Sequence, residues 1–278
     1  MQAKPQRPFH TRYQSLLLLV LFFLASGCQP TQGLTMSRTH TAEEFFTGPH
    51  LELARAIEQN DVATLHKVAD GVDLSAQGHN QMTLMWYAVM KKKPEAIRAL
   101  VELGVHPADD EMDGMLARTP LGAALMSEET LYLEAMLDGG LSPNDINESG
   151  TPILHRAVRF GTLAHVKLLV EHGADVNLKG DTTALDQSTL SSKPEIGVYL
   201  IEEGSTPNFR HDNGVTTAWG VHLQIQNLEH GPMRDGFIRL RDMMIERGVE
   251  FPPPSPVEVR EQMRAEGLTP VVPFGHDR

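Results

Sequence analysis

The chain has 278 residues, a formal net charge of −12 and one cysteine. So acidic a chain is a poor candidate for nucleic-acid binding, which needs basic patches on the protein surface. A single cysteine forms no disulfide within the chain, so packing alone must stabilise the fold.

The first 27 residues have the pattern of an export signal. Basic residues precede a ten-residue apolar run, Leu16 to Ala25, which is too short to span a bilayer as a mature helix. The next stretch, Leu24-Ala25-Ser26-Gly27-Cys28, resembles a bacterial lipobox, although its leucine lies four places before the cysteine instead of the usual three. The resemblance implies cleavage before Cys28 and lipidation of that residue. The alternative is an ordinary secretory signal followed by an unmodified cysteine.

The residue after the cysteine bears on the destination of the chain. By resemblance to lipoproteins of Gram-negative bacteria, Gln29 implies an outer-membrane anchor with the mature chain in the periplasm. Residues 28–44 are polar and lack apolar periodicity, so we expect a flexible tether. Removal of the signal takes the formal charge to −15, so the lipid anchor and not the protein surface would hold the chain at the membrane. Met36 could also start a cytosolic form without the signal.

Six apolar helical runs between residues 45 and 252 end in glycine. The spacings between these glycines are 33, 36, 33, 31 and 44 residues, and the glycines are Gly71, Gly104, Gly140, Gly173, Gly204 and Gly248. A period of this size is typical of stacked repeats. We therefore predict an all-α solenoid of about six helix-turn-helix units, with a long binding surface in place of a catalytic pocket.

The fourth unit carries the most distinctive motif. It opens with Thr151-Pro152-Ile153-Leu154-His155-Arg156-Ala157 and closes with Gly173-Ala174-Asp175-Val176-Asn177. Both segments resemble the ankyrin repeat, with one residue inserted in the opening. Looser copies of the opening begin at Thr83, Thr119, Thr183 and Thr217. The resemblance implies an ankyrin-repeat solenoid whose first and last units are degenerate.

The sixth unit and the C-terminal segment depart from the repeat. The longest glycine spacing implies about eleven extra residues around Leu228 to Asp235, and insertions in repeat proteins often lie on the binding face. Three prolines from Pro252 end the repeats. Ser255 and Glu258 then have capping-box spacing, so within residues 253–278 we predict a capping helix to about Glu266 and a loose tail.

Side chains of the first helices are candidates for partner contact. The ankyrin resemblance places five of them toward the groove: Tyr87, Met90, Arg156, Arg159 and Phe160. Methionine and aromatic side chains on a surface adapt well to a protein partner. Trp86 and Trp219 could also pack in the groove, but the core is the favoured place for both.

Two loops between units are further candidates. The first is acidic and contains Asp109, Asp110, Glu111 and Asp113. It could engage a basic partner or simply be solvated; a calcium site is a third option, but the ligand order does not match an EF-hand. The second loop combines an aromatic residue with mixed charges: Phe209, Arg210, His211 and Asp212.

The sequence gives little support to catalysis. It has no Gly-x-Ser-x-Gly elbow, no His-Glu-x-x-His and no phosphate-binding glycine loop. His155, His165 and His172 are expected to be structural, which leaves His222 and His230 beside the enlarged sixth unit as the one pair that could meet. We predict a non-enzyme without metal or cofactor.

Exported ankyrin lipoproteins resemble immunity proteins that protect bacteria from type VI secretion effectors, notably periplasmic phospholipases. The resemblance implies that the chain binds and neutralises a basic or lipase-type effector protein. The alternative is a housekeeping envelope scaffold that binds a resident periplasmic enzyme of oxidative-stress defence or wall assembly.

Overall fold

The computed structural model describes residues 40–108 and 119–273. Within these ranges the regular secondary structure is helical, and the extended pairing is limited to two isolated bridges, Ile146 with Pro152 and Arg210 with Thr216. The all-α prediction is therefore confirmed. Across the same ranges no helix has both the length and the apolar character needed to cross a bilayer.

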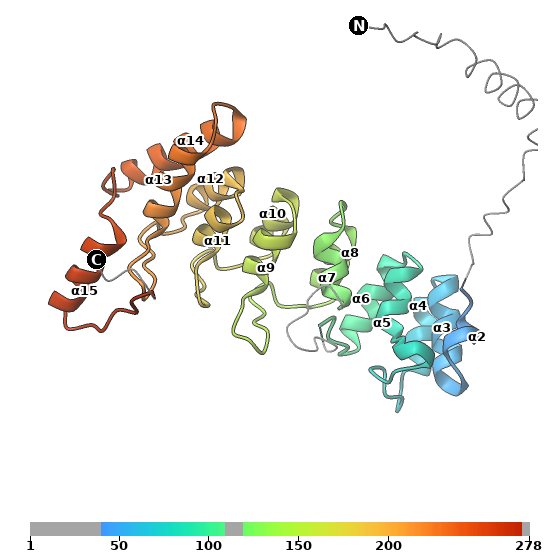
Figure 1. Cartoon of the computed structure of the whole chain (residues 1–278). Coiled ribbons are helices and arrows are strands. Elements are labelled where there is room, and N and C mark those ends of the chain that lie inside the picture. Colours follow the sequence, from blue (N-terminus) through green and yellow to red (C-terminus); the bar gives the residue numbers. More distant parts are fainter. Residues whose placement is uncertain (1–39, 109–118, 274–278) are drawn as a thin grey trace, which may run out of the picture. The chain divides into compact units, whose positions relative to one another are not determined.

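The helices follow one another in pairs along the chain (Figure 1). The first pair consists of α3 (Gly48–Gln59) and α4 (Val62–Val68). The short helix α2 (Ala42–Phe45) precedes this pair, and a 3-10 turn at His79–Gln81 follows it. The next four pairs are α5 (Leu84–Met90) and α6 (Pro94–Glu102), α7 (Pro120–Met126) and α8 (Leu131–Asp138), α9 (Ile153–Phe160) and α10 (Leu163–Glu171), and α11 (Ala184–Leu190) and α12 (Pro194–Glu202). The last elements are α13 (Thr217–Asn227), α14 (Pro232–Glu246) and α15 (Pro256–Ala265).

Threonine hydroxyls begin most of the first helices. Each accepts a hydrogen bond from the backbone N–H three residues later, and the four are Thr83, Thr119, Thr183 and Thr216. In α9 the N-cap is Pro152, which has no side-chain acceptor, so the inserted residue leaves Thr151 one place outside the helix. The sixth opening starts at Thr216 and not at Thr217 as the motif suggested, because the Thr217 hydroxyl donates to Asp186 instead.

Glycine ends the second helix of every unit. The six glycines predicted from the spacing have φ between 71° and 106°: Gly71, Gly104, Gly140, Gly173, Gly204 and Gly248. This left-handed region is strained for residues with a Cβ. A local backbone requirement therefore sets the period that is visible in the sequence.

Neighbouring units stack helix on helix. First helices contact one another from α3 through α5, α7, α9 and α11 to α13, and second helices meet in the pairs α4–α6, α6–α8, α10–α12 and α12–α14. One apolar core runs from α2 to α12, and a second lies within α11 to α14. Ala88, Ala124 and Ala157 are buried in the first of these cores, where small side chains allow the helices to approach closely.

Packing begins earlier at the N-terminal end than the predicted tether allows. Phe45 and Phe46 are buried, and their ring centroids lie 6.0 and 5.4 Å from that of Tyr87. The segment from Ala42 therefore belongs to the folded stack, because its aromatic side chains pack against Tyr87 of α5. The prediction of a flexible tether up to residue 44 is wrong for these last residues.

The extra length of the sixth unit is mostly helical. Helix α13 has 11 residues and α14 has 15, whereas the helices from α5 to α12 have 7 to 9. The insertion thus extends both helices on either side of a short turn at residues 228–231, and it is not a loop. Beyond it, α15 begins with the predicted capping box between Ser255 and Glu258.

Candidate functional site

Four exposed apolar side chains occupy the same place in four of the first helices, α5, α7, α11 and α13. Each lies seven residues after its N-cap threonine, and we call the set the first-helix stripe: Met90, Met126, Leu190 and Leu223. Their side chains are 37%, 47%, 63% and 37% exposed, respectively. Because first helices of neighbouring units contact one another, equivalent positions lie along one face of the stack. The stripe is an apolar surface without a cover among the described residues.

Helix α9 places a cation in line with the stripe. Seven residues after its N-cap, Pro152, stands Arg159, and its guanidinium lies 5.0 Å from the ring centroid of Phe160. Both side chains are exposed. The arginine is held over an aromatic face, so the surface stays partly apolar while carrying one positive charge. Met90, Arg159 and Phe160 are exposed, as partner contact requires, and that contact stays a prediction.

Two other predicted contact residues are buried. The Tyr87 hydroxyl donates to Glu58 at 2.5 Å, and Arg156 donates to Asp145 at 3.1 Å. Both positions lie four residues after the N-cap, where the side chain turns toward the preceding part of the stack and not toward solvent. The expectation that Tyr87 and Arg156 contact a partner is therefore wrong.

The two tryptophans are more exposed than expected. Trp86 and Trp219 lie three residues after their N-caps and are half-buried, so they are not core residues. The Trp219 ring lies 5.7 Å from the ring of His222, between centroids. Both indoles therefore add partly exposed aromatic surface to the first helices that carry the stripe.

The three histidines predicted to be structural join units or cap helices. The imidazole Nε2 of His155 lies 3.0 Å from the Leu178 carbonyl oxygen, and that of His165 lies 3.1 Å from the Ala124 carbonyl oxygen. Burial lowers the pKa of both imidazoles, which favours the neutral form. His172 contacts the carbonyl of Leu168, one turn earlier, at 2.9 Å. The structural role of His155 and His165 is confirmed, whereas His172 is an exposed residue at the helix end.

The histidines near the sixth unit each have a local neighbour. His222 Nε2 lies 2.8 Å from the side-chain nitrogen of Gln226, and His230 Nδ1 lies 3.4 Å from the guanidinium of Arg234. In the described ranges no three histidine, cysteine or carboxylate side chains gather as a metal site would require. The structure therefore gives this pair no shared chemistry.

The loop from Phe209 to Asp212 supports the fold more than it offers a free surface. Arg210 forms an ion pair with Glu266 after the capping helix at 2.9 Å, and His211 Nε2 lies 2.9 Å from a carboxylate oxygen of buried Asp186. Phe209 lines a cavity of about 250 Å³ against α15. Asp212 alone of the four is exposed. The predicted acidic loop, Asp109, Asp110, Glu111 and Asp113, lies outside the described residues.

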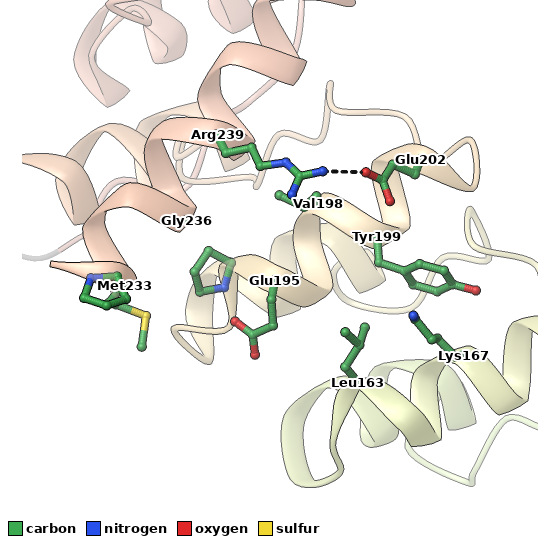
Figure 2. Close-up of a pocket in the computed structure, with 11 residues that line it drawn as sticks. Leu163, Lys167, Glu195, Val198, Tyr199, Glu202, Met233, Gly236 and Arg239 are labelled. Atoms are coloured by element: carbon green, nitrogen blue, oxygen red, sulfur yellow. Dashed lines mark hydrogen bonds and ion pairs between the residues drawn. The ribbon is translucent and has the colours of Figure 1, made fainter.

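A second surface lies on the opposite set of helices. A groove of about 430 Å³ separates α10, α12 and α14, and Figure 2 shows the residues around it. We call it the second-helix groove, lined by Leu163, Lys167, Pro194, Glu195, Val198, Tyr199, Glu202, Pro232, Met233, Gly236 and Arg239. Its lining surface is mainly apolar, with charged groups at the rim. Sequence reasoning missed this groove; a glycine inside the long helix α14 was the available hint.

Gly236 explains how α14 comes so close to α12. A Cβ at this position would lie 2.8 Å from the Cγ of Pro194, closer than real side chains allow. Gly197 on α12 likewise allows Leu240 of α14 to approach α12 closely, since a Cβ at Gly197 would lie 2.9 Å from Leu240. The two glycines set the distance between the helices and so one wall of the groove.

Comparisons with known proteins agree with this architecture. A family model described as ankyrin repeats in three copies matches residues 106–180 and 132–211. Protein PhlB of Serratia liquefaciens is 34% identical over 137 residues, which cover 48% of this chain and 59% of PhlB. The B-cell lymphoma 3 protein homolog of Mus musculus is 30% identical over 171 residues, covering 57% of this chain and 38% of that protein. The matched segments thus span less than two thirds of either relative.

Solved structures show the same fold at low sequence identity. The ankyrin repeat domain of Bcl-3 aligns with a TM-score of 0.54 at 21% identity, covering 75% of this chain and 92% of that domain. An ankyrin repeat domain from Acinetobacter baumannii aligns with a TM-score of 0.52 at 18% identity, covering 71% and 98%. Residues 106–211 therefore match ankyrin repeats, and the chain has the ankyrin-repeat fold, which is typical of protein–protein interaction modules.

Proposed function

We propose that the chain is a lipid-anchored periplasmic protein that binds and neutralises a secreted antibacterial effector. The observation that carries the binding part is the first-helix stripe. Its four side chains are apolar, exposed and repeated at one helical position. Contiguous exposed apolar surface marks interaction sites, and methionine adapts its shape to a partner.

The location is proposed from the sequence at the N-terminal end. Cys28 follows an apolar export segment and lies where a lipoprotein carries its acyl chains. Anchoring by more than one acyl chain is durable. A protein held at the envelope in this way meets an effector that arrives from outside before the effector reaches its target.

Neutralisation requires binding and no chemistry. A stack of packed helices presents the stripe with little loss of conformational freedom, because its positions are fixed by contacts between units. The net charge of −12 speeds the capture of a basic partner. A lipase-type effector covered at the surface around its active site would be excluded from its lipid substrate.

A competition assay tests this function. Cells that lack the chain are mixed with sibling cells that deliver the effector encoded beside its gene. We expect cells without the gene to be killed, and we expect the same cells to survive once the gene is restored. Survival of the lacking cells without restoration would contradict the proposed immunity role.

A housekeeping scaffold is the second candidate, and the second-helix groove is the observation that favours it. A scaffold holds two partners, and the stripe and the groove lie on different helices of the stack. This role predicts a resident periplasmic enzyme as partner, with a growth defect in pure culture when the chain is absent. Crosslinking in unstressed cells distinguishes the two roles, because recovery of only a secreted effector argues against the scaffold.

A further inference from the structure

We propose that the second-helix groove docks a segment of a protein partner that inserts one large aliphatic side chain and places a lysine or arginine against Glu195. This site is separate from the first-helix stripe, and it does not depend on the effector role. It would give the chain a second partner surface, on α10, α12 and α14.

The lining of the groove fits an aliphatic side chain, and its size leaves room for the neighbouring residues of the docked segment. Its volume of about 430 Å³ lies in the range of sites that bury a ligand. Carbon atoms of Leu163, Pro194 and Val198 line it. Met233 stands at the α14 side with 44% of its surface exposed, so its flexible thioether can close over an inserted group.

The charges at the rim determine which flanking residue fits. Arg239 is paired with Glu202 at 2.8 Å, and the Lys167 amine lies 5.4 Å from the ring centroid of Tyr199 (Figure 2). These cations therefore already have favourable neighbours. An incoming acidic side chain would have to compete with Glu202 for Arg239.

Glu195 differs from the other charged groups of the groove. Its carboxylate is exposed and makes no hydrogen bond or ion pair within the described ranges. The nearby amine of Lys193 attracts it only at a distance, because that amine donates to the carbonyls of Val158, Arg159 and Gly161. A cationic side chain beside the aliphatic one is thus the complement of this site, in keeping with the net charge of −12.

The repeat provides a matched control. Glu95 follows Pro94 at the start of α6 just as Glu195 follows Pro194 at the start of α12. It borders a smaller hollow of about 150 Å³ between α6 and α8. Charge reversal at either glutamate removes the same favourable interaction with a helix N-terminus, so both variants should lose similar stability.

The experiment uses the full chain and a labelled synthetic decapeptide of alternating leucine and arginine. Two companion peptides carry serine in place of leucine, or glutamate in place of arginine. Binding is followed by fluorescence anisotropy at physiological ionic strength for the wild-type chain and for Glu195→Arg, Met233→Asp and Glu95→Arg. Circular dichroism confirms that each variant is folded.

Of the three peptides, we expect only the leucine–arginine peptide to show saturable binding. Glu195→Arg and Met233→Asp should each weaken it by about ten-fold or more, as removal of a central contact does, and Glu95→Arg should leave it unchanged. Equal weakening by Glu95→Arg, or equal binding of the serine–arginine peptide, would show general charge attraction and overturn the proposal. Absence of saturable binding would overturn it as well. Loss with Met233→Asp but not with Glu195→Arg would indicate an apolar ligand without a basic neighbour, which contradicts the stated partner.

Discussion

His165 on α10 reaches the end of α7 in the preceding unit, where its Nε2 lies 3.1 Å from the carbonyl oxygen of Ala124. The Thr162 N–H donates to Nδ1 at 3.2 Å, so Nε2 carries the proton and donates to the carbonyl. One neutral imidazole thereby accepts a hydrogen bond from the backbone at the start of α10 and donates one to a backbone carbonyl near the end of α7.

Replacement of this imidazole should cost substantial stability. For His165→Ala we expect the free energy of unfolding to fall by about 2–4 kcal/mol, because a buried side chain is lost and two backbone groups each lose a hydrogen bond. Urea denaturation followed by circular dichroism measures the change. His172→Ala is the matched control: its exposed imidazole contacts a carbonyl of its own helix and, at 3.4 Å, the exposed carboxylate of Asp138, so the loss should stay within about 1 kcal/mol. Equal losses in the two variants would contradict the role of His165.

The two buried histidines also predict a pH dependence. Burial lowers the pKa of His155 and His165 below the ordinary value of 6.5, so the unfolded chain binds protons that the native chain does not. The free energy of unfolding should be steady above pH 7 in this respect and should fall as the pH drops below about 6.5, by up to about 1.4 kcal/mol per pH unit for each histidine.

Urea denaturation over a series of pH values between about 5 and 8 checks this slope. His165→Gln should reduce the slope because glutamine does not titrate. The hydrogen bond from His106 holds the pKa of Asp145 below its ordinary value of 3.8. Titration of this carboxylate therefore changes the free energy of unfolding only at lower pH than the histidines do. An unchanged slope in the glutamine variant would rule out His165 as a source of the slope.

Tyr87 should behave as a core residue. Tyr87→Phe loses only the hydroxyl that donates to Glu58 and should lower the free energy of unfolding by about 1 kcal/mol. Tyr87→Ala also loses the ring between Phe45 and Phe46 and should cost about 3–5 kcal/mol. Thermal and urea denaturation give both values. A tolerated alanine would mean that this side chain lies on the surface after all.

Lipidation is tested separately from the fold. Cys28→Ala should remove the attachment point of the acyl chains, and the chain should then be recovered in the soluble periplasmic fraction. Labelling with radioactive palmitate and fractionation of the envelope measure the effect. Palmitate incorporation that persists in the variant would show that another residue carries the lipid.

The local features of the fold could be predicted from the sequence. N-cap threonines and left-handed glycines are decided by their own few residues, so the repeat period and the capping box at Ser255 were found correctly. The face of each helix was harder to predict. Trp86 and Tyr87 are adjacent in α5, and contacts with the neighbouring unit decide which of the two is buried. The sequence pattern favours Trp86 for the core, but Tyr87 is the buried residue.

The features that the sequence did not reveal depend on distant contacts. The sequence pattern predicts that Arg210 and His211 lie on the surface, but their partners, Glu266 and Asp186, lie 56 and 25 residues away along the chain. The second-helix groove likewise results from the approach of Gly236 to Pro194. Such distances are set by the stacking of units, and a single sequence does not specify them.

The most direct test of the account is the affinity of the purified chain for the effector encoded beside its gene, measured by isothermal titration calorimetry. Leu190→Asp and Met126→Asp change exposed side chains, so both variants should keep the stability of the wild type. We expect each to weaken binding by about thirty-fold, as loss of an interface hot spot does, while Leu268→Asp, exposed but outside the stripe, binds like the wild type. Wild-type affinity in both stripe variants would contradict the claim that the first-helix stripe binds the effector.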